Sequence, residues 1–376
     1  MIAVCIGLIL ALSAYGTFEY VERLPAPGTT QLTIYTYTSL FGGNCAPPAN
    51  VTDLVFAPFE RLHHVQIQLE CPAGTLVNTL LEEKDAPGAD LVVGLDEITT
   101  EQADADHLLI PYASPQLANV PSDLVTELAS DHAATPYEWG YLGIDYTPSF
   151  FSTTQGAVAA SAFPEFARNS SWAKQLLIED PETDITGEEF LLWEIEFYQQ
   201  VLHQSNWGSW WQTVDPDLAV APDWSTAFSE FTTPPNNPSM VVSYSTDPAY
   251  AAYTGTPGAY NSTVSTQNGS AYGWKTVYGI GIVNGTKHLT LDQEFIDWFL
   301  GGNVQSEIPT NEWEYPANAT VPVPPAYNWT LNVSSIHALN DGVSPSTIQA
   351  DLTTSWLPEW QQIYDQYGCP HGGCSA

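Results

Sequence analysis

The side chains of this chain that could take part in chemistry are mostly aromatic, and several stand at the ends of predicted elements. Tyr37 and Tyr244 each end a run typical of a strand, Trp224 begins a predicted helix, and Trp313 lies in a Pro-rich segment. In open α/β sheets, ligands bind at the carboxyl ends of the strands. Aromatic faces there suit a flat cationic ligand, through stacking and cation–π attraction of roughly 0.5 to 2 kcal/mol per contact. The alternative is that these rings only fill the core.

No motif in the sequence indicates an enzyme. The chain contains no GxSxG, no P-loop and no dinucleotide-binding fingerprint. Acidic pairs such as Glu188–Glu189 are expected by chance among 43 Asp and Glu. His371 could join Cys369 and Cys374 in a metal site, but structural zinc normally takes four ligands. We therefore expect a binding protein without catalytic residues, metal or cofactor.

The charge and composition exclude several classes of protein. The chain has 376 residues, with 43 Asp and Glu against 7 Lys and Arg, and a formal net charge of -36. Nucleic acids and anionic lipid surfaces are bound through clustered Lys and Arg, so neither is an expected partner. Because 44% of the residues are hydrophobic and 12% aromatic, the chain is not an acidic disordered protein. It is a globular protein of two domains or two lobes.

Several features point to an exported protein. Residues 1–15 are nearly all apolar and resemble the core of a signal peptide or a short membrane anchor, and residues 21–31 then form a linker. N-x-Ser/Thr sequons are compatible with a glycosylated exterior. They occur at Asn50, Asn169, Asn261, Asn268, Asn284, Asn318, Asn328 and Asn332. We expect an exported protein that is tethered to the outer face of the membrane, periplasmic or secreted.

The cysteines outside the apolar leader suit two disulfides. Cys369 and Cys374 are close enough in sequence to pair, which leaves Cys45 to pair with Cys71. The metal site named above is the alternative for Cys369 and Cys374.

Strands and helices alternate along the chain, which predicts an α/β fold built from βαβ units. The predicted strands are residues 31–37, 64–69, 89–94, 108–111, 140–146, 239–244 and 277–283. The predicted helices are residues 74–84, 186–203, 291–300 and 347–367, the last interrupted at Pro358. Thr186 and Glu189 have the spacing of a capping box, and Asp247–Pro248 that of a helix start. The segment 308–332 is predicted as loop.

Six segments resemble, in the same order, those of the thiamine-binding substrate-binding proteins of ABC transporters. They are TIYTYTSL (33–40), ADLVVGLD (89–96), EDPETDITGEEFLLW (179–193), DWSTAF (223–228), VVSYSTDPAY (241–250) and IPTNEWEYP (308–316). The resemblance implies the two-lobed α/β fold of type II periplasmic binding proteins, with a ligand cleft between the lobes. Residues 1–28 would be leader and linker, 29–139 the first part of lobe one and 140–274 lobe two. Residues 275–376 would return to lobe one and end in a helix.

The same resemblance implies a function and a set of binding residues. The protein would be a monomer that captures thiamine, or its phosphates, and delivers it to a membrane permease. No covalent bond of the ligand would be made or broken. The implied binding residues are Tyr37, Ala73, Asp184, Ile185, Trp224, Tyr244, Ser245, Thr246, Asp247, Tyr250 and Trp313. Two positions depart from the family pattern. Where family members usually have an acidic residue followed by Gly before the first helix, this chain has Pro72–Ala73. Where they have a Ser-Thr pair, this chain has Asp184–Ile185.

Two other functions remain open from the sequence. A protein of this fold could bind a polyamine through Asp96, Glu138, Asp184 and Asp247, or could bind iron. A glycosylated surface or adhesion protein that kept the fold and lost its ligand would also carry the sequons. None of the seven basic residues lies in the matched segments, so a phosphate would have to be bound by backbone amides at helix starts such as Gly187 or Ala249. Unphosphorylated thiamine is therefore expected to bind at least as well as the diphosphate.

Overall fold

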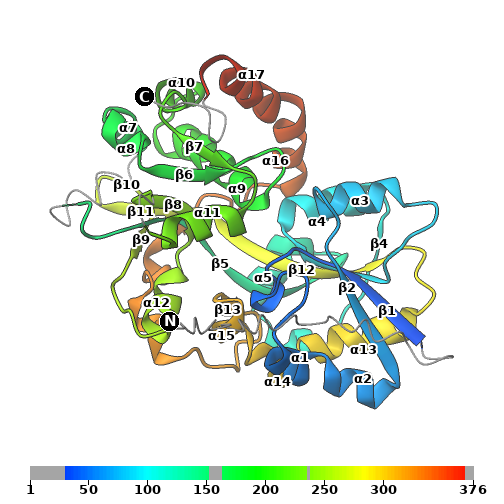
Figure 1. Cartoon of the computed structure of the whole chain (residues 1–376). Coiled ribbons are helices and arrows are strands. Elements are labelled where there is room, and N and C mark those ends of the chain that lie inside the picture. Colours follow the sequence, from blue (N-terminus) through cyan, green and yellow to red (C-terminus); the bar gives the residue numbers. More distant parts are fainter. Residues whose placement is uncertain (1–29, 152–162, 235–237, 369–376) are drawn as a thin grey trace, which may run out of the picture.

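A curved eleven-stranded sheet forms the centre of the molecule (Figure 1). The computed structural model describes residues 30–151, 163–234 and 238–368, so the predicted leader, Cys369 and Cys374 lie outside it. The strand order is β2-β1-β3-β12-β5-β8-β6-β7, with β4, β9 and β13 at the sides. These strands are β1 (Thr30–Tyr35), β2 (Val65–Glu70), β3 (Leu91–Leu95), β4 (Leu109–Ile110), β5 (Ala134–Tyr146), β6 (Leu176–Glu179), β7 (Ala219–Ala221), β8 (Met240–Tyr244), β9 (Asn261–Thr263), β12 (Lys275–Val283) and β13 (Tyr315–Pro316). A second sheet contains β10 (Ser265–Gln267), β11 (Ser270–Gly273) and β14 (Ile336–Ala338).

Two long central strands join the two lobes. In lobe one, β1 pairs in parallel with β2 and β3, and in lobe two β6 pairs in parallel with β7 and β8. Between them, β12 runs antiparallel to both β3 and β5, and β5 runs antiparallel to β8. The sequence predicted only residues 140–146 of β5, because its first half contains Pro136 and lacks alternation. The strand β5 therefore carries the chain from lobe one into lobe two, and β12 carries it back towards lobe one.

Helices cover both faces of the sheet, as expected for this class. They are α1 (Ala49–Val55), α2 (Ala57–His63), α3 (Leu76–Glu82), α4 (Glu97–Ala105), α5 (Ser122–Ala129), α7 (Phe163–Ala167), α8 (Ser170–Ala173), α9 (Ile185–Glu196), α10 (Gly208–Val214), α11 (Trp224–Thr232), α12 (Asp247–Tyr253), α13 (Leu289–Phe299), α14 (Gly302–Gln305), α15 (Ile308–Asn311), α16 (Pro345–Asp351) and α17 (Leu357–Tyr367). None of the described helices is both long and apolar enough to cross a membrane.

Two helix starts differ from their prediction. Asp184, not Thr186, caps α9, and its carboxylate accepts a hydrogen bond from the amide of Thr186. Similarly, α12 begins at Asp247 with Thr246 as its cap residue. In α9 the chain turns into the helix earlier than the capping pattern indicated, because the Asp184 side chain satisfies one of the first amides. At the start of α12, Thr246 makes no side-chain hydrogen bond to the helix.

The C-terminal helices pack in the core of lobe two. Trp360 of α17 is 1% exposed and meets Trp211 of α10 edge to face, with 6.0 Å between the ring centroids. Ile348 of α16 and Ile363 of α17 belong to the same hydrophobic cluster. Pro358 lies in the first turn of α17, where no amide hydrogen is needed, so it does not interrupt the helix. Figure 1 shows α17 beside α10, away from α1 and α2.

The Pro-rich segment 308–332 is not wholly loop. It contains α15, the short strand β13, which pairs with Trp139 and Glu138 of β5, and the 3-10 helix η4 (Pro325–Trp329). Asn318 in this segment is only 3% exposed, and its side-chain amide donates to the carbonyl of Leu300. Its sequon is therefore inaccessible to glycosylation in the folded protein.

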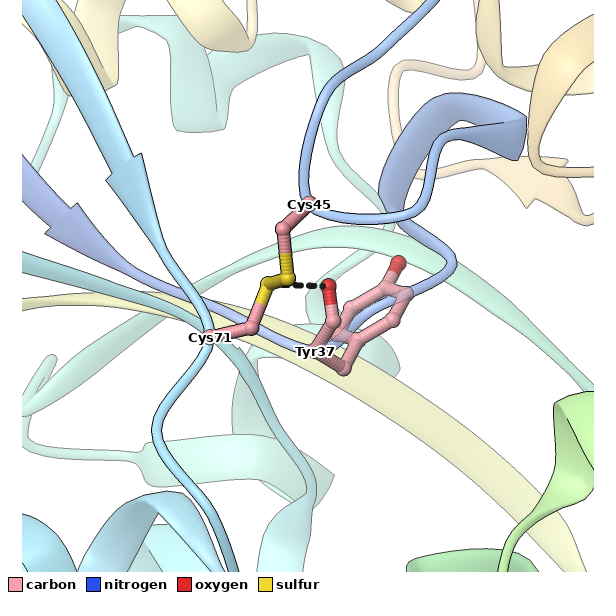
Figure 2. The surroundings of a disulfide bond; sticks show 3 residues. All are labelled: Tyr37, Cys45 and Cys71. Carbon is pink, nitrogen blue, oxygen red and sulfur yellow. Dashed lines mark hydrogen bonds between the residues drawn. A yellow bond between two sulfur atoms is a disulfide. The ribbon is translucent and has the colours of Figure 1, made fainter.

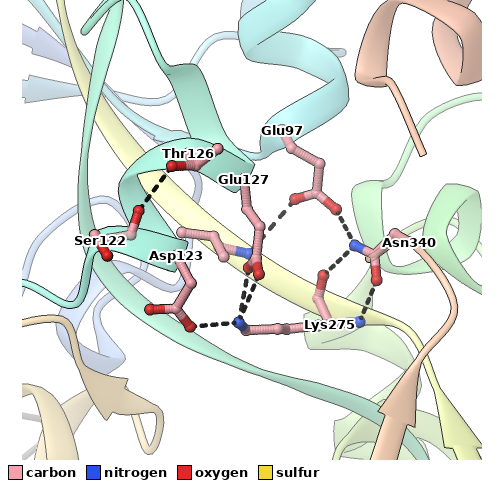
Figure 3. Close-up of polar contacts among 8 residues, drawn as sticks. Glu97, Ser122, Asp123, Thr126, Glu127, Lys275 and Asn340 are labelled. Atoms are coloured by element: carbon pink, nitrogen blue, oxygen red, sulfur yellow. Dashed lines mark hydrogen bonds and ion pairs between the residues drawn. The ribbon is translucent and has the colours of Figure 1, made fainter. Parts of the chain in front are cut away.

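Lys275 anchors the start of β12 to lobe one (Figure 3). Its Nζ lies 2.7 Å from Oε2 of Glu127 and 3.5 Å from Oδ2 of Asp123, both on α5. The side-chain amide of Asn340 donates to Oε1 of Glu97, at 2.7 Å, and to the backbone carbonyl of Lys275. The base of this crossing strand is thereby bonded to two helices of lobe one.

Candidate ligand-binding site

Seven aromatic residues from both lobes form a continuous series of ring contacts, which we call the aromatic circuit. It consists of Tyr37, Tyr278, Tyr244, Trp224, Phe228, Tyr250 and Trp313. Successive ring centroids lie 6.4, 6.4, 6.2, 5.1, 6.5 and 5.2 Å apart. Five of the seven are among the binding residues that the sequence predicted. The structure therefore brings together aromatic rings that are up to 276 positions apart in the sequence, from Tyr37 to Trp313.

Tyr37 closes the circuit through a hydrogen bond. It follows β1, and its hydroxyl donates to Oε2 of Glu312, the residue before Trp313, over 2.9 Å. The same hydroxyl lies 3.1 Å from that of Tyr137 and 3.3 Å from Oε1 of Glu138. Its ring covers Gly94, where a Cβ atom would come within 2.4 Å of the ring. Since Gly94 also has a φ of +103°, only glycine suits this position.

A disulfide holds the backbone of Tyr37 (Figure 2). Cys45 and Cys71 are joined, as the cysteine count predicted, and the sulfur of Cys71 lies 3.4 Å from the carbonyl oxygen of Tyr37. The bond ties the loop after β1 to the loop after β2. Ala73, a predicted binding residue two positions beyond Cys71, is exposed. Its side chain is a methyl group, so it offers a ligand only its backbone and that methyl.

The start of α11 carries Trp224 into the circuit and ties it to two other elements. Its indole Nε1 donates to Oγ of Ser243 on β8 over 2.8 Å, and its backbone amide donates to Oδ2 of Asp184 over 3.1 Å. The carboxylate of Asp184 therefore links the start of α9 to the start of α11. Burial raises the pKa of Asp184 to about 6. Ile185, the next predicted residue, is half buried and packs against the core cluster of lobe one.

The end of β8 supplies four consecutive predicted residues. The hydroxyl of Tyr244 lies 2.5 Å from that of Tyr278 on β12 and 3.2 Å from Oγ1 of Thr186. Thr246 donates to Oε1 of Glu314 over 3.1 Å, while Oγ of the fully buried Ser245 has no protein partner. Asp247 accepts from Oγ of Ser243 and from the amide of Tyr244.

Trp313 lies between two tyrosines of α12. The rings of Tyr250 and Tyr253 each meet it edge on, with centroids 5.2 Å away. Trp313 has a φ of 64°, a left-handed conformation that is unusual for a bulky residue. Tyr250 is 38% exposed and Tyr253 58% exposed. This end of the circuit is therefore its solvent-facing end, and the Tyr37 end is its interior.

A cavity of about 490 Å³ lies between the lobes next to the circuit. Its lining residues come from the loop after Tyr37 on one side and from both sides of Trp224 in the sequence on the other. They are Thr38, Gly43, Asn44, Asp223, Ser225, Thr226, Ser229 and Glu230. All of them are small or polar, so the aromatic faces next to them supply the apolar part of any binding surface.

Buried carboxylates are the main electrostatic feature of the interior end. Glu138 is 2% exposed and Glu314 4% exposed, and one oxygen of each has no hydrogen-bond partner. Burial raises the pKa of Glu138 to about 8. Burial, with the nearby charge of Glu138 second, raises the pKa of Glu312 well above its usual range. The ion pairs of the described residues involve neither these three glutamates nor Asp184 and Asp247.

Over the described ranges, no set of three or more His, Cys, Asp and Glu is arranged to hold a metal ion. The neighbouring hydroxyl pair of Tyr244 and Tyr278 is bonded within the protein.

The sequence missed several residues of this region. Tyr278 and Phe228 belong to the circuit, and Glu312 and Glu314 flank Trp313. Phe228 could have been found, because it lies one helical turn after Trp224 and its ring stacks on that indole. Tyr278 had no such signal, since it is one of several aromatic residues on strands that fill a core.

Comparisons with known proteins show which proteins the chain resembles over most of its length. The chain is 26% identical over 326 residues to the thiamine-binding periplasmic protein of Brucella melitensis, covering 85% of this chain and 90% of that protein. It is 24% identical over 366 residues to the thiamine-binding periplasmic protein of Escherichia coli, covering 96% and 99%. No protein-family profile matches the chain.

Solved structures share the fold. A periplasmic thiamin binding protein superposes with a TM-score of 0.72 at 23% identity, covering 89% of this chain and 96% of that one. Iron-bound HitA from Pseudomonas aeruginosa superposes with a TM-score of 0.64 at 15% identity, covering 89% and 99%. The chain therefore has the two-lobed fold of the type II periplasmic binding proteins, and over most of its length its sequence is similar to thiamine-binding periplasmic proteins.

Proposed function

We propose that this protein is an extracytoplasmic solute-binding protein that captures thiamine and delivers it to the permease of an ABC transporter. The observation that carries the proposal is the aromatic circuit, which connects both lobes. One of its rings, Tyr278, lies on the crossing strand β12. Thiamine consists of two flat rings, one of them permanently cationic, and aromatic faces attract such rings. The similarity to thiamine-binding periplasmic proteins supports the same ligand.

Ligand capture would proceed by closure of the lobes. Tyr37, Trp224, Tyr250 and Trp313 would hold the rings, and Tyr244 with the amides of residues 245–247 would supply directional hydrogen bonds. The lobes would rotate about β5 and β12, with residues 29–139 moving against residues 140–274. The helix α17 would move with lobe two, in whose core it packs, whereas α16 also contacts α4 of lobe one. The closed form would be the one that the permease recognises.

A calorimetric titration of the full chain with thiamine tests this function. Saturable binding with one site is expected, with no turnover of the ligand. Tyr250→Ala should weaken binding by about 1 to 3 kcal/mol, because an aromatic contact with the ligand is removed. Tyr367→Ala is the matched control, since Tyr367 is 38% exposed, as Tyr250 is, but lies on α17 outside the circuit. Absence of thiamine binding would contradict the proposal.

A screen against other ligands tests the alternatives. Thermal unfolding is measured with thiamine, thiamine diphosphate, spermidine and Fe(III), because a ligand at 100 times its dissociation constant adds about 2.7 kcal/mol of stability. A shift with spermidine alone would indicate a polyamine-binding protein, and a shift with Fe(III) alone an iron-binding one. No shift with any ligand would favour a surface protein that has lost its ligand.

A further inference from the structure

The three glutamates at the interior end of the circuit have no ion-pair partner among the residues that the structure describes. Glu138 lies on the crossing strand β5, and Glu312 and Glu314 flank Trp313. Among the described basic residues, Lys275 bonds to Asp123 and Glu127, Lys174 to Asp217, and Arg168 to Glu165. Unpaired buried carboxylates are costly, because burial removes their hydration without supplying a counter-charge.

The carboxylates are joined to the binding residues rather than scattered in the core. Tyr37 donates to Glu312 over 2.9 Å and lies 3.3 Å from Glu138, while Thr246 donates to Glu314 over 3.1 Å. The phenol of Tyr37 has one hydrogen to share between Glu138 and Glu312. Tyr137 also bonds to Glu138, and the amide of Phe41 donates to Oε1 of Glu312. In addition, Oε2 of Glu138 and Oε2 of Glu314 have no partner at all. This leaves acceptor capacity beside the hydroxyls of Tyr37 and Thr246, in carboxyl groups whose negative charge a bound cation would stabilise.

We propose that Glu138, Glu312 and Glu314 are specificity-determining residues that supply the counter-charge for the cationic ring of the ligand. The inference rests on the proposed function and deepens it. Aromatic faces alone accept neutral and cationic heterocycles, whereas a buried carboxylate group discriminates between them by charge. The site then selects a permanently charged heterocycle, and it disfavours an anionic substituent near the same end.

A pair of ligands with the same shape and different charge tests the inference without any mutation. Deazathiamine carries a neutral thiophene ring in place of the thiazolium ring and is otherwise matched to thiamine. Calorimetry on the wild-type chain should show thiamine binding at least about tenfold more tightly, since loss of one partner of a buried charge pair costs more than tenfold. Equal affinity for the two would overturn the counter-charge role while leaving thiamine binding intact. Failure of the chain to bind thiamine at all would instead refute the proposed function, and the inference with it.

Two isosteric variants then assign the effect to these residues. Glu138→Gln and Glu312→Gln keep an oxygen that accepts a hydrogen bond and remove the charge. Each should weaken thiamine at least about tenfold and leave deazathiamine within about twofold. Asp53→Asn, on the exposed face of α1, removes the same charge outside the site and should change neither affinity. A parallel loss of both ligands in the Gln variants would show that the glutamates act through the shape of the site, and would overturn the inference.

Discussion

The phenol of Tyr37 donates a 2.9 Å hydrogen bond to Glu312, a residue 275 positions later in the chain. This bond connects the end of the first strand to the segment that presents Trp313. The two aromatic residues that the sequence placed at opposite ends of the protein are therefore parts of one structural unit. A substitution at Tyr37 should therefore affect the position of Trp313, and a substitution at Glu312 the position of Tyr37.

Removing the Tyr37–Glu312 hydrogen bond should weaken the ligand site without unfolding the protein. Tyr37→Phe keeps the ring and its contact with Tyr278, and it leaves Glu312 without that donor. We expect a loss of about 1 to 3 kcal/mol in thiamine affinity, which is the usual effect of removing one partner of a buried hydrogen bond. Calorimetry measures the change. An affinity equal to that of wild type would mean that the bond does not help to position the circuit.

The Cys45–Cys71 disulfide should stabilise the protein and also support ligand binding. It closes a loop across a sequence separation of 26, for which the chain-entropy estimate is about 3 to 4 kcal/mol. Because Cys71 contacts the carbonyl of Tyr37, the double variant Cys45→Ala, Cys71→Ala should both unfold at lower urea and bind thiamine more weakly. Adding reductant to the wild-type protein should reproduce both effects. Adding it to the double variant should lower neither the urea midpoint nor the thiamine affinity any further.

The free protein should lose stability as the pH rises from about 4.5 to about 8. Burial, followed by the charge of Asp96, raises the pKa of Glu97 to about 8, and burial raises that of Glu138 to about 8. In this range the folded state binds more protons than the unfolded state, so the free energy of unfolding falls with rising pH. Each such group contributes a slope of up to about 1.4 kcal/mol per pH unit.

Differential scanning calorimetry at pH 5, 6, 7 and 8 checks this pH dependence. Glu138→Gln should flatten the slope and raise the unfolding temperature at pH 8, because the variant mimics the protonated carboxyl. Stability that instead rises between pH 5 and pH 8 would contradict the assignment.

Lys275 should matter more to stability than any exposed lysine. Lys275→Met leaves Glu127 and Asp123 without their cation at the base of β12, and we expect a loss of about 1 to 3 kcal/mol. Lys174→Met is the control, because the Lys174 side chain is 53% exposed and its pair with Asp217 is 3.5 Å long. That variant should stay within about 1 kcal/mol of wild type. Equal urea midpoints for the two variants would show that the network of Figure 3 is not stabilising.

Phosphorylation of the ligand should not improve binding. The binding region contains the carboxylates of Glu138, Glu312 and Glu314, whereas Lys275 is held by α5 at the base of the crossing strand. Competition calorimetry should therefore give thiamine an affinity equal to or higher than that of thiamine diphosphate. A clear preference for the diphosphate would indicate that amides at a helix start bind the phosphates.

The sequence by itself determined the class of fold, seven strands of the central sheet and five members of the aromatic circuit. Strand and helix signals are local: β-branched runs such as residues 240–244 and the i, i+4 spacing of Leu76 and Leu80 depend only on near neighbours. The pairing of Cys45 with Cys71 also followed from a count of cysteines.

The tertiary structure decided what those residues do. It showed that Asp184 bonds α9 to α11, that α17 packs on lobe two, and that Glu138 and Glu312 meet at Tyr37. No local pattern carries this information, because the partners are separated by 40 to 275 positions and are brought together only by the folding of the sheet. Whether one of 43 acidic residues is solvated or buried beside an aromatic ring depends on that long-range arrangement, and so does its charge.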